Sequence, residues 1–90
     1  MMPVTVFVLD VEEFAPVLAA ARKLDEAIIA GPQKGYYRIQ TPGELVLQRK
    51  PMGLKPALWW SMLTGGYIGH ITSYTRDEMR MTSAVVEAGK

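Results

Sequence analysis

The chain has no cysteine and only one histidine, His70, among its 90 residues. Without thiols there is no disulfide framework, no thiolate metal site and no cysteine nucleophile. A single histidine with scattered carboxylates does not make up the residue sets that usually bind zinc. We therefore expect no metal and no cofactor, and the lack of cysteine fits a reducing, cytoplasmic location.

An excess of either charge is also missing, because 10 basic and 9 acidic residues leave a formal net charge of +1. A nearly neutral chain has little general attraction to phosphate backbones, and the signature of RNA-recognition motifs is absent, so we expect no nucleic-acid partner. The uncharged run at residues 57–69 is shorter than the roughly 20 residues that a membrane span needs. No basic segment precedes the apolar residues 3–9, as it would in a signal peptide. We expect a soluble chain.

The composition is that of one globular domain over residues 1–90, with 49% hydrophobic and 21% charged residues. Residues 4–9 are apolar and mostly β-branched, which favours a strand buried on both faces or a central strand. The apolar residues that come next share one face of a helix: Phe14, Val17, Leu18, Ala21 and Leu24. Proline is tolerated only in the first turn of a helix, so Pro16 means that this helix begins near Glu13 or has a distorted start.

Two strand-like runs, residues 36–40 and 44–50, flank a short connection with glycine, which predicts a β-hairpin. In the first run Tyr37 and Ile39 would share one face, with Tyr36, Arg38 and Gln40 on the other. Before them, residues 27–30 either extend the first helix or form a short strand. Prolines and glycines then delimit a second helix at residues 56–64. Residues 67–74 read as a strand that returns, after a polar turn, as residues 79–82, and residues 85–90 are expected to fray.

This order of elements predicts an α+β two-layer sandwich. We expect an antiparallel or mixed sheet of four to five strands, with both helices on one face and a ferredoxin-like βαββαβ order. A topology of this kind carries no information about function, so function has to be argued from individual residues.

The helix predicted at residues 56–64 has no charged residue, and it contains Trp59, Trp60 and Met62. Neighbouring residues on a helix point about 100° apart, so the two tryptophans face different surroundings. Either both are core residues, or one of them helps to form an interface, where tryptophan is enriched. We therefore expect a non-catalytic binding or assembly module that forms a homo-oligomer or docks a protein partner through this helix.

An alternative function is a ligand-binding protein or small enzyme that holds a carboxylate-bearing small molecule. Arginine offers a two-pronged donor for a carboxylate, and the residues that could line such a pocket are Tyr37, Trp60, His70, Tyr74 and Arg76. Each also has a simpler explanation, His70 as a strand residue and Arg76 as part of a surface turn. No nucleophile motif surrounds either Ser61 or Ser73, and the glycines at 65–69 suit a helix end better than a phosphate loop. Catalysis is therefore not expected.

Overall fold

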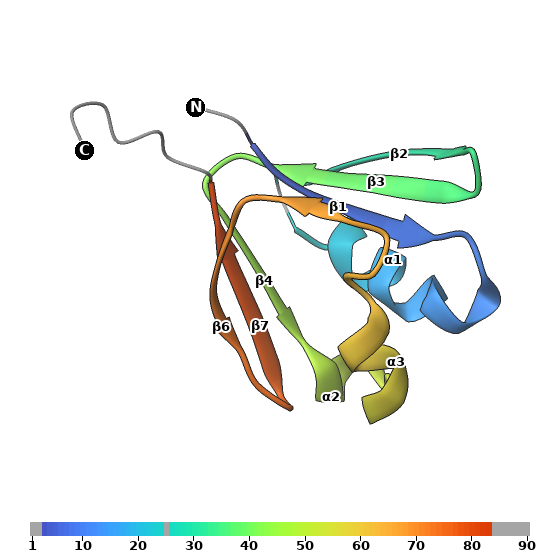
Figure 1. The fold of residues 1–90 in the computed structure, drawn as a ribbon, viewed down its shortest axis with the longest axis vertical. Helices are drawn as coiled ribbons and strands as arrows, with labels where there is room; N and C mark the ends of the chain where they lie inside the picture. The colour runs from blue at the N-terminus through green and yellow to red at the C-terminus, as the bar shows by residue number, and fades with distance from the viewer. Residues whose placement is uncertain (1–2, 25, 84–90) are drawn as a thin grey trace.

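The computed structural model describes residues 3–24 and 26–83 (Figure 1). Its elements are β1 (Val4–Leu9), the 3-10 helix η1 (Glu12–Phe14), α1 (Ala15–Arg22), β2 (Ile28–Gln33), β3 (Tyr36–Thr41), β4 (Glu44–Gln48), α2 (Arg49–Met52), α3 (Pro56–Ser61), β5 (Tyr67–Ile68), β6 (His70–Tyr74) and β7 (Glu78–Thr82). The strands form two antiparallel sheets. Sheet A has the order β2-β3-β1-β5, and sheet B has the order β4-β7-β6.

Alternation along β1 gives sheet A a buried inner face. Val4, Val6 and Val8 are at most 1% exposed, and they belong to the same core cluster as the inward side chains of α1. The residues between them, Thr5 and Phe7, lie on the other face, because successive side chains on a strand point to opposite sides. β1 is thus a central strand whose two faces differ, rather than a strand buried equally on both.

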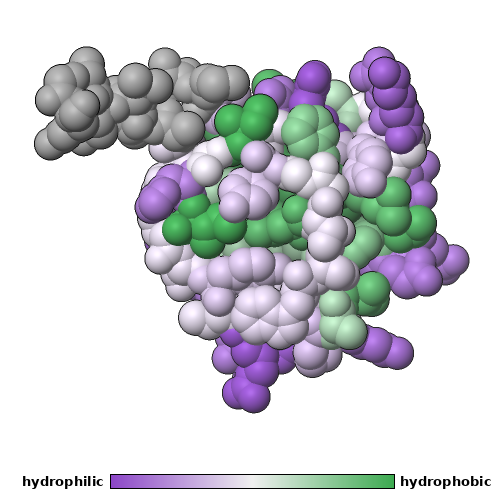
Figure 2. Space-filling view, viewed as in Figure 1, coloured by the Kyte–Doolittle hydropathy of each residue, from purple (hydrophilic) through white to green (hydrophobic). Residues whose placement is uncertain are grey.

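Sheet B contributes a second buried face, formed by alternate residues of its paired strands: Leu45, Leu47, Met79 and Met81. Its outer face is polar. There the Arg80 guanidinium forms ion pairs with two carboxylates, Nη1 to Glu44 Oε2 at 3.2 Å and Nη2 to Glu78 Oε1 at 3.4 Å. Ion pairs of this exposed kind contribute about 0–1 kcal/mol each, so the stability of sheet B comes mainly from its apolar face. Figure 2 shows hydrophobic residues across the middle of this side of the molecule, between the two sheets, with the most hydrophilic residues at its rim.

The α+β class is confirmed, but the predicted single sheet with a ferredoxin-like order is not what the chain forms. The predicted hairpin between residues 36–40 and 44–50 is wrong, because β3 already has β1 on one side and β2 on the other. The chain instead turns at Pro42 and Gly43 out of sheet A and into sheet B. Ser83 fixes this corner, since its Oγ accepts from the Gly43 N–H at 3.1 Å and donates to the Gly43 carbonyl at 3.0 Å.

A second crossing between the sheets divides the strand predicted at residues 67–74. β5 pairs with β1 in sheet A, whereas β6 pairs with β7 in sheet B, and Gly69 lies between them. The apolar pattern of these residues continues through both strands. Pattern alone therefore does not show that the chain changes sheets here.

β6 and β7 form the hairpin expected around the polar turn, and a second hairpin, which was not predicted, joins β2 to β3 through Lys34 and Gly35. Both residues have positive φ, 54° and 86°, which is the arrangement of a two-residue type I′ turn, and Gln33 pairs with Tyr36 at its base. Of the two alternatives for residues 27–30, the strand is correct. It continues beyond Ala30 despite Gly31 and Pro32, because β2 is an edge strand, where proline is tolerated.

The helices also differ from the predicted pair. A 3-10 turn precedes α1 and places Pro16 in its first turn, so the distorted start is the correct alternative. The short helix α2 was not predicted, and α3 ends at Ser61 instead of continuing to residue 64. No helix within the described residues is long and apolar enough to cross a membrane. The expected fraying at residues 85–90 falls outside the described part of the chain.

Candidate functional site

The domain covers one side of the apolar helix α3, whose other side exposes Pro56, Ala57 and Trp60. Trp59 is fully buried, and its Nε1–H donates to the Thr75 carbonyl at 2.7 Å. Met62, just beyond the helix, is 2% exposed, whereas Trp60 is 50% exposed. Of the three residues expected at an interface, only Trp60 offers side-chain surface to a partner. The two tryptophans do face different surroundings, as the helical spacing requires.

Tyr74 connects α3 to the end of sheet B. Its hydroxyl donates to the Trp59 carbonyl. The centroid of its ring lies 4.8 Å from that of Trp60 and 5.7 Å from that of Trp59, which it meets edge-on. Burial raises the pKa of the Tyr74 hydroxyl to about 12, because desolvation disfavours the phenolate. This side chain therefore has a structural role, joining a helix to a strand while it is neutral.

The Tyr74 pKa predicts a loss of stability in alkali. An unfolded tyrosine ionises near pH 10, whereas folded Tyr74 keeps its proton to about pH 12. The unfolded state therefore binds fewer protons in this window, so stability is complete below pH 10 and falls as the pH rises to 12. Because Tyr74 is only partly buried and solvent screens the effect, we expect the free energy of unfolding to fall by about 1 kcal/mol between pH 10 and pH 12. Urea unfolding at several pH values between 10 and 12 measures how the free energy of unfolding changes with pH. This dependence on pH should be weaker in Tyr74→Phe than in wild type. An equal dependence in both proteins would contradict the assignment to Tyr74.

His70 and Tyr74 do not meet, although they lie on the same strand. His70 pairs with Thr82 at one end of β6, and Tyr74 pairs with Met79 at the other end. A β-bulge between Ile71 and Ser73 inserts an extra residue, so Ile71 and Tyr74 both pack on the core although they are three residues apart. His70, next to Ile71, faces the other way and is exposed.

The remaining two residues of the expected ligand site are also apart. Tyr37 is on the inner face of sheet A, partly buried against the core, in register with Val8. Arg76 is exposed in the turn between β6 and β7, and its carbonyl accepts from Arg49 Nε at 2.7 Å. The nearby Asp77 pairs with Arg49 at 3.5 Å. Of the five residues, the structure brings together only Trp60 and Tyr74.

A different surface, the outer face of sheet A, gathers side chains from all four of its strands. Register across the sheet places them in three rows: Ile28, Gln40, Thr5 and Ile68; Ala30, Arg38 and Phe7; Gln33, Tyr36 and Leu9. Six of these ten residues are apolar and only one is charged. Figure 1 shows the described helices on the opposite side of the sheet. We call these ten residues the outer face of sheet A.

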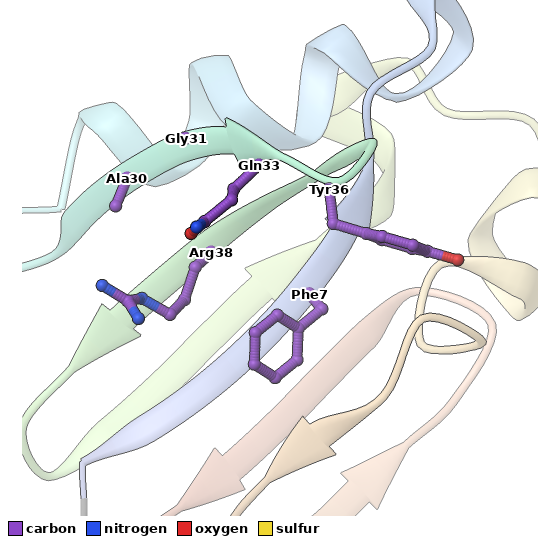
Figure 3. Close-up of a pocket in the computed structure, with 6 residues that line it drawn as sticks. All are labelled: Phe7, Ala30, Gly31, Gln33, Tyr36 and Arg38. Atoms are coloured by element: carbon purple, nitrogen blue, oxygen red, sulfur yellow. The ribbon is translucent and has the colours of Figure 1, made fainter.

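Two adjoining hollows of ≈ 80 and ≈ 390 Å³ lie on this face, and we refer to them together as the groove. Phe7, Gln33 and Tyr36 line both hollows. The smaller one adds Arg38 and the backbone near Gly31, and the larger one adds Lys34 and Gly65. In Figure 3 the polar ends of Gln33 and Arg38 lie on one side of the Phe7 ring, and Tyr36 extends on the other side.

The groove has cations and no anions among its lining residues. Arg38 is exposed on β3, directly opposite Phe7 in the register, and Lys34 is exposed in the β2–β3 turn. Neither forms an ion pair with a residue in the described ranges. The Gln33 amide adds a neutral donor and acceptor. The groove therefore combines two aromatic rings with positive charge that is not neutralised locally.

Gly65 shapes one wall of the groove through close packing. A Cβ atom at this position would lie 2.5 Å from the Phe7 carbonyl oxygen and 2.7 Å from the Tyr36 ring. The Gly66 carbonyl also accepts from the Phe7 N–H at 3.0 Å, which holds the α3–β5 connection against β1. The Tyr36 ring thus lies directly against the Gly65 backbone, which leaves no room for a side chain at residue 65.

The described residues give little support to metal binding or nucleophilic catalysis. Within the described residues no group of three histidine or carboxylate side chains is placed to hold a metal ion. Ser61 Oγ donates to the Leu58 carbonyl at 3.1 Å, which is a local helix contact rather than an activated nucleophile. His70 is exposed on the outer side of sheet B, and the groove is on sheet A, so the two do not form one site.

The sequence matches no protein-family model, and no curated protein matches it significantly. Function therefore has to be argued from the geometry of this chain alone.

Sequence reasoning placed Tyr36, Arg38 and Gln40 on one strand face and Tyr37 and Ile39 on the other, and the burial pattern of β3 confirms this. It missed that Phe7 lies beside Arg38. The available signal was the alternation within β1, in which valines at residues 4, 6 and 8 are separated by Thr5, Phe7 and Leu9. A run of this kind conceals the alternation, because Phe7 and Leu9 on one face are as hydrophobic as the valines on the other.

Proposed function

We propose that this chain is a binding module that assembles with a second copy of itself through the outer face of sheet A. The observation that carries the proposal is the exposure of large apolar side chains on this face: Ile28 is 65% exposed, Leu9 40% and Tyr36 37%. Such side chains on one sheet face, without a covering helix, are typical of an interaction surface.

The composition of the face supports a second copy as the partner. Interface cores are enriched in aromatic residues and arginine and depleted in lysine and carboxylates, as this face is. A two-fold pairing places the same patch on both sides, so apolar rows would meet apolar rows. Arg38 is the only charged residue of the face, so two copies can stack with little repulsion. An acidic protein partner would call for more cations than this.

The dimensions of the face predict a weak complex. Three strands of six residues and the two residues of β5, at ~4.8 Å spacing and ~3.4 Å rise, give roughly 330 Å² of projected area on each copy. This lies at the small end of specific protein interfaces, so we expect a dissociation constant on the order of 10–100 μM rather than nanomolar affinity.

Sedimentation of three proteins tests the proposal. Wild type should form dimers at about 200 μM, while Ile28→Glu, which places a charge on an exposed position of the face, should remain monomeric. Trp60→Glu is the matched control, because it puts the same charge on the exposed tryptophan of α3. A monomeric wild type contradicts self-association. Dimers that survive Ile28→Glu and are lost in Trp60→Glu would place the interface on the helix.

A further inference from the structure

We propose that the groove on sheet A binds a small anion that carries a flat apolar group, such as an aromatic carboxylate. The groove shares Phe7, Ala30, Gln33, Tyr36 and Arg38 with the face proposed for self-association, so a ligand and a second copy would compete for it. Groove binding itself does not require two copies. The ligand chemistry follows from the cations of the groove, from its aromatic walls and from its size.

The cations specify a negative charge on the ligand. Arg38 presents a planar guanidinium, which can donate two parallel hydrogen bonds to a carboxylate, and Lys34 adds a second positive charge at the turn. Because no carboxylate lines the groove, a ligand does not compete with an internal ion pair for Arg38. The chain as a whole is nearly neutral, so this attraction is local to the groove.

The walls specify a flat apolar group. The Phe7 ring lies beside Arg38 across the strand pair, and the Tyr36 ring is held against Gly65 on the other side. Aromatic rings favour offset or edge-on contact with another ring, and they keep their shape because they have few rotatable bonds. A ligand ring over Phe7 could therefore place its carboxylate at Arg38 without leaving the groove.

The size of the groove favours a small molecule over a polymer. Its larger hollow, ≈ 390 Å³, falls in the range of about 300–1,000 Å³ that is usual for ligand pockets. A nucleic-acid strand needs a stripe of cations along its backbone, whereas this groove has two. One negative group and one ring system match what the lining residues provide.

The test is a titration of ¹⁵N-labelled protein with 2-naphthoate, followed by amide chemical shifts. Two comparison compounds each lack one feature: 2-naphthamide has the ring without the charge, and inorganic phosphate has the charge without the ring. We expect 2-naphthoate to shift the Gly31 and Gly65 amides in a saturable manner, with a dissociation constant of about 1 mM or lower. Each comparison compound should bind at least about tenfold more weakly, since each loses one set of contacts.

Matched variants locate the anion. Arg38→Gln should weaken 2-naphthoate binding about tenfold or more, because it removes the charge-assisted hydrogen bonds. Arg22→Gln removes the same charge at a site away from the groove. Arg22 is in the last turn of α1, and this helix packs against the inner side of sheet A. The Arg22→Gln variant should therefore bind 2-naphthoate as wild type does. Repeating the titration with Ile28→Glu, which is expected to be monomeric and changes no lining residue of the groove, keeps the two proposals apart, so a failure of self-association leaves this result unchanged. Equal shifts from all three compounds, no saturable shifts, or equal affinity in Arg38→Gln and wild type would each overturn the proposal.

Discussion

Replacing Trp59 with alanine should cost the domain about 3–5 kcal/mol of unfolding free energy, as is typical for removing a large buried aromatic side chain. Trp59 is fully buried, belongs to the core shared by the sheets and helices, and stacks edge-on with Tyr74. Its loss would also leave the partly buried hydrogen bond to the Thr75 carbonyl unmade. Since single domains are stable by only about 5–15 kcal/mol, this loss would remove a large share of the stability and lower the Tm.

Trp60→Ala is the natural control, because it makes the same chemical change at the next residue. Trp60 is 50% exposed and mainly contacts Tyr74, so we expect a loss near 1 kcal/mol. Urea denaturation followed by far-ultraviolet circular dichroism compares the variants without relying on tryptophan fluorescence. Similar losses for both substitutions would mean that the two tryptophans are not divided between core and surface in this way.

Gly65→Ala should destabilise the domain by about 2–4 kcal/mol, which places it among the severe single-residue substitutions. The added Cβ would fall 2.5 Å from the Phe7 carbonyl oxygen, and backbone in a central strand cannot easily move away. The Tyr36 ring, at 2.7 Å, would have to move as well, so the groove should lose one of its walls. Thermal unfolding measures the first effect, and amide shifts of Phe7 and Tyr36 report the second.

Gly35→Ala separates crowding from backbone conformation. Gly35 has a φ of +86°, which alanine adopts with strain, but a Cβ there would have no neighbour within 4 Å. We expect Gly35→Ala to lower the free energy of unfolding by about 1 kcal/mol, because of the strained backbone conformation alone. If Gly65→Ala cost no more than Gly35→Ala, the close approach of the α3–β5 connection to β1 would not be a stabilising contact.

The sequence allowed prediction of most elements but not of their partners. The alternation in β3 and the apolar face of α1 are local features, because one segment determines which side chains share a side. The assignment of β3 and β4 to different sheets depends on β1, β2 and β7, which lie elsewhere in the chain. A glycine-containing connection between two strands is therefore compatible with a hairpin and equally with a corner between two sheets.

The residues of the expected ligand site are dispersed for a related reason. His70, Tyr74 and Arg76 are close in sequence, but the β-bulge in β6 changes which residues of that strand face the core. The groove instead combines residues 7, 33, 36 and 38, which belong to three strands. Their proximity follows from the antiparallel register of β1, β3 and β2. Without a known pairing, the sequence pattern could not distinguish this register from one shifted by two residues.

The position of β7 at the centre of sheet B bears on the order in which the fold can assemble. β4 and β6 both pair with β7 and not with each other, and Gln48 of β4 meets Glu78, thirty positions further along the chain. Closing so long a loop costs chain entropy before any strand contact is made, whereas the β2–β3 hairpin closes through two residues. Any partly folded form that lacks β7 therefore leaves both edges of β4 open, with the apolar side chains of Leu45 and Leu47 still without a sheet to join.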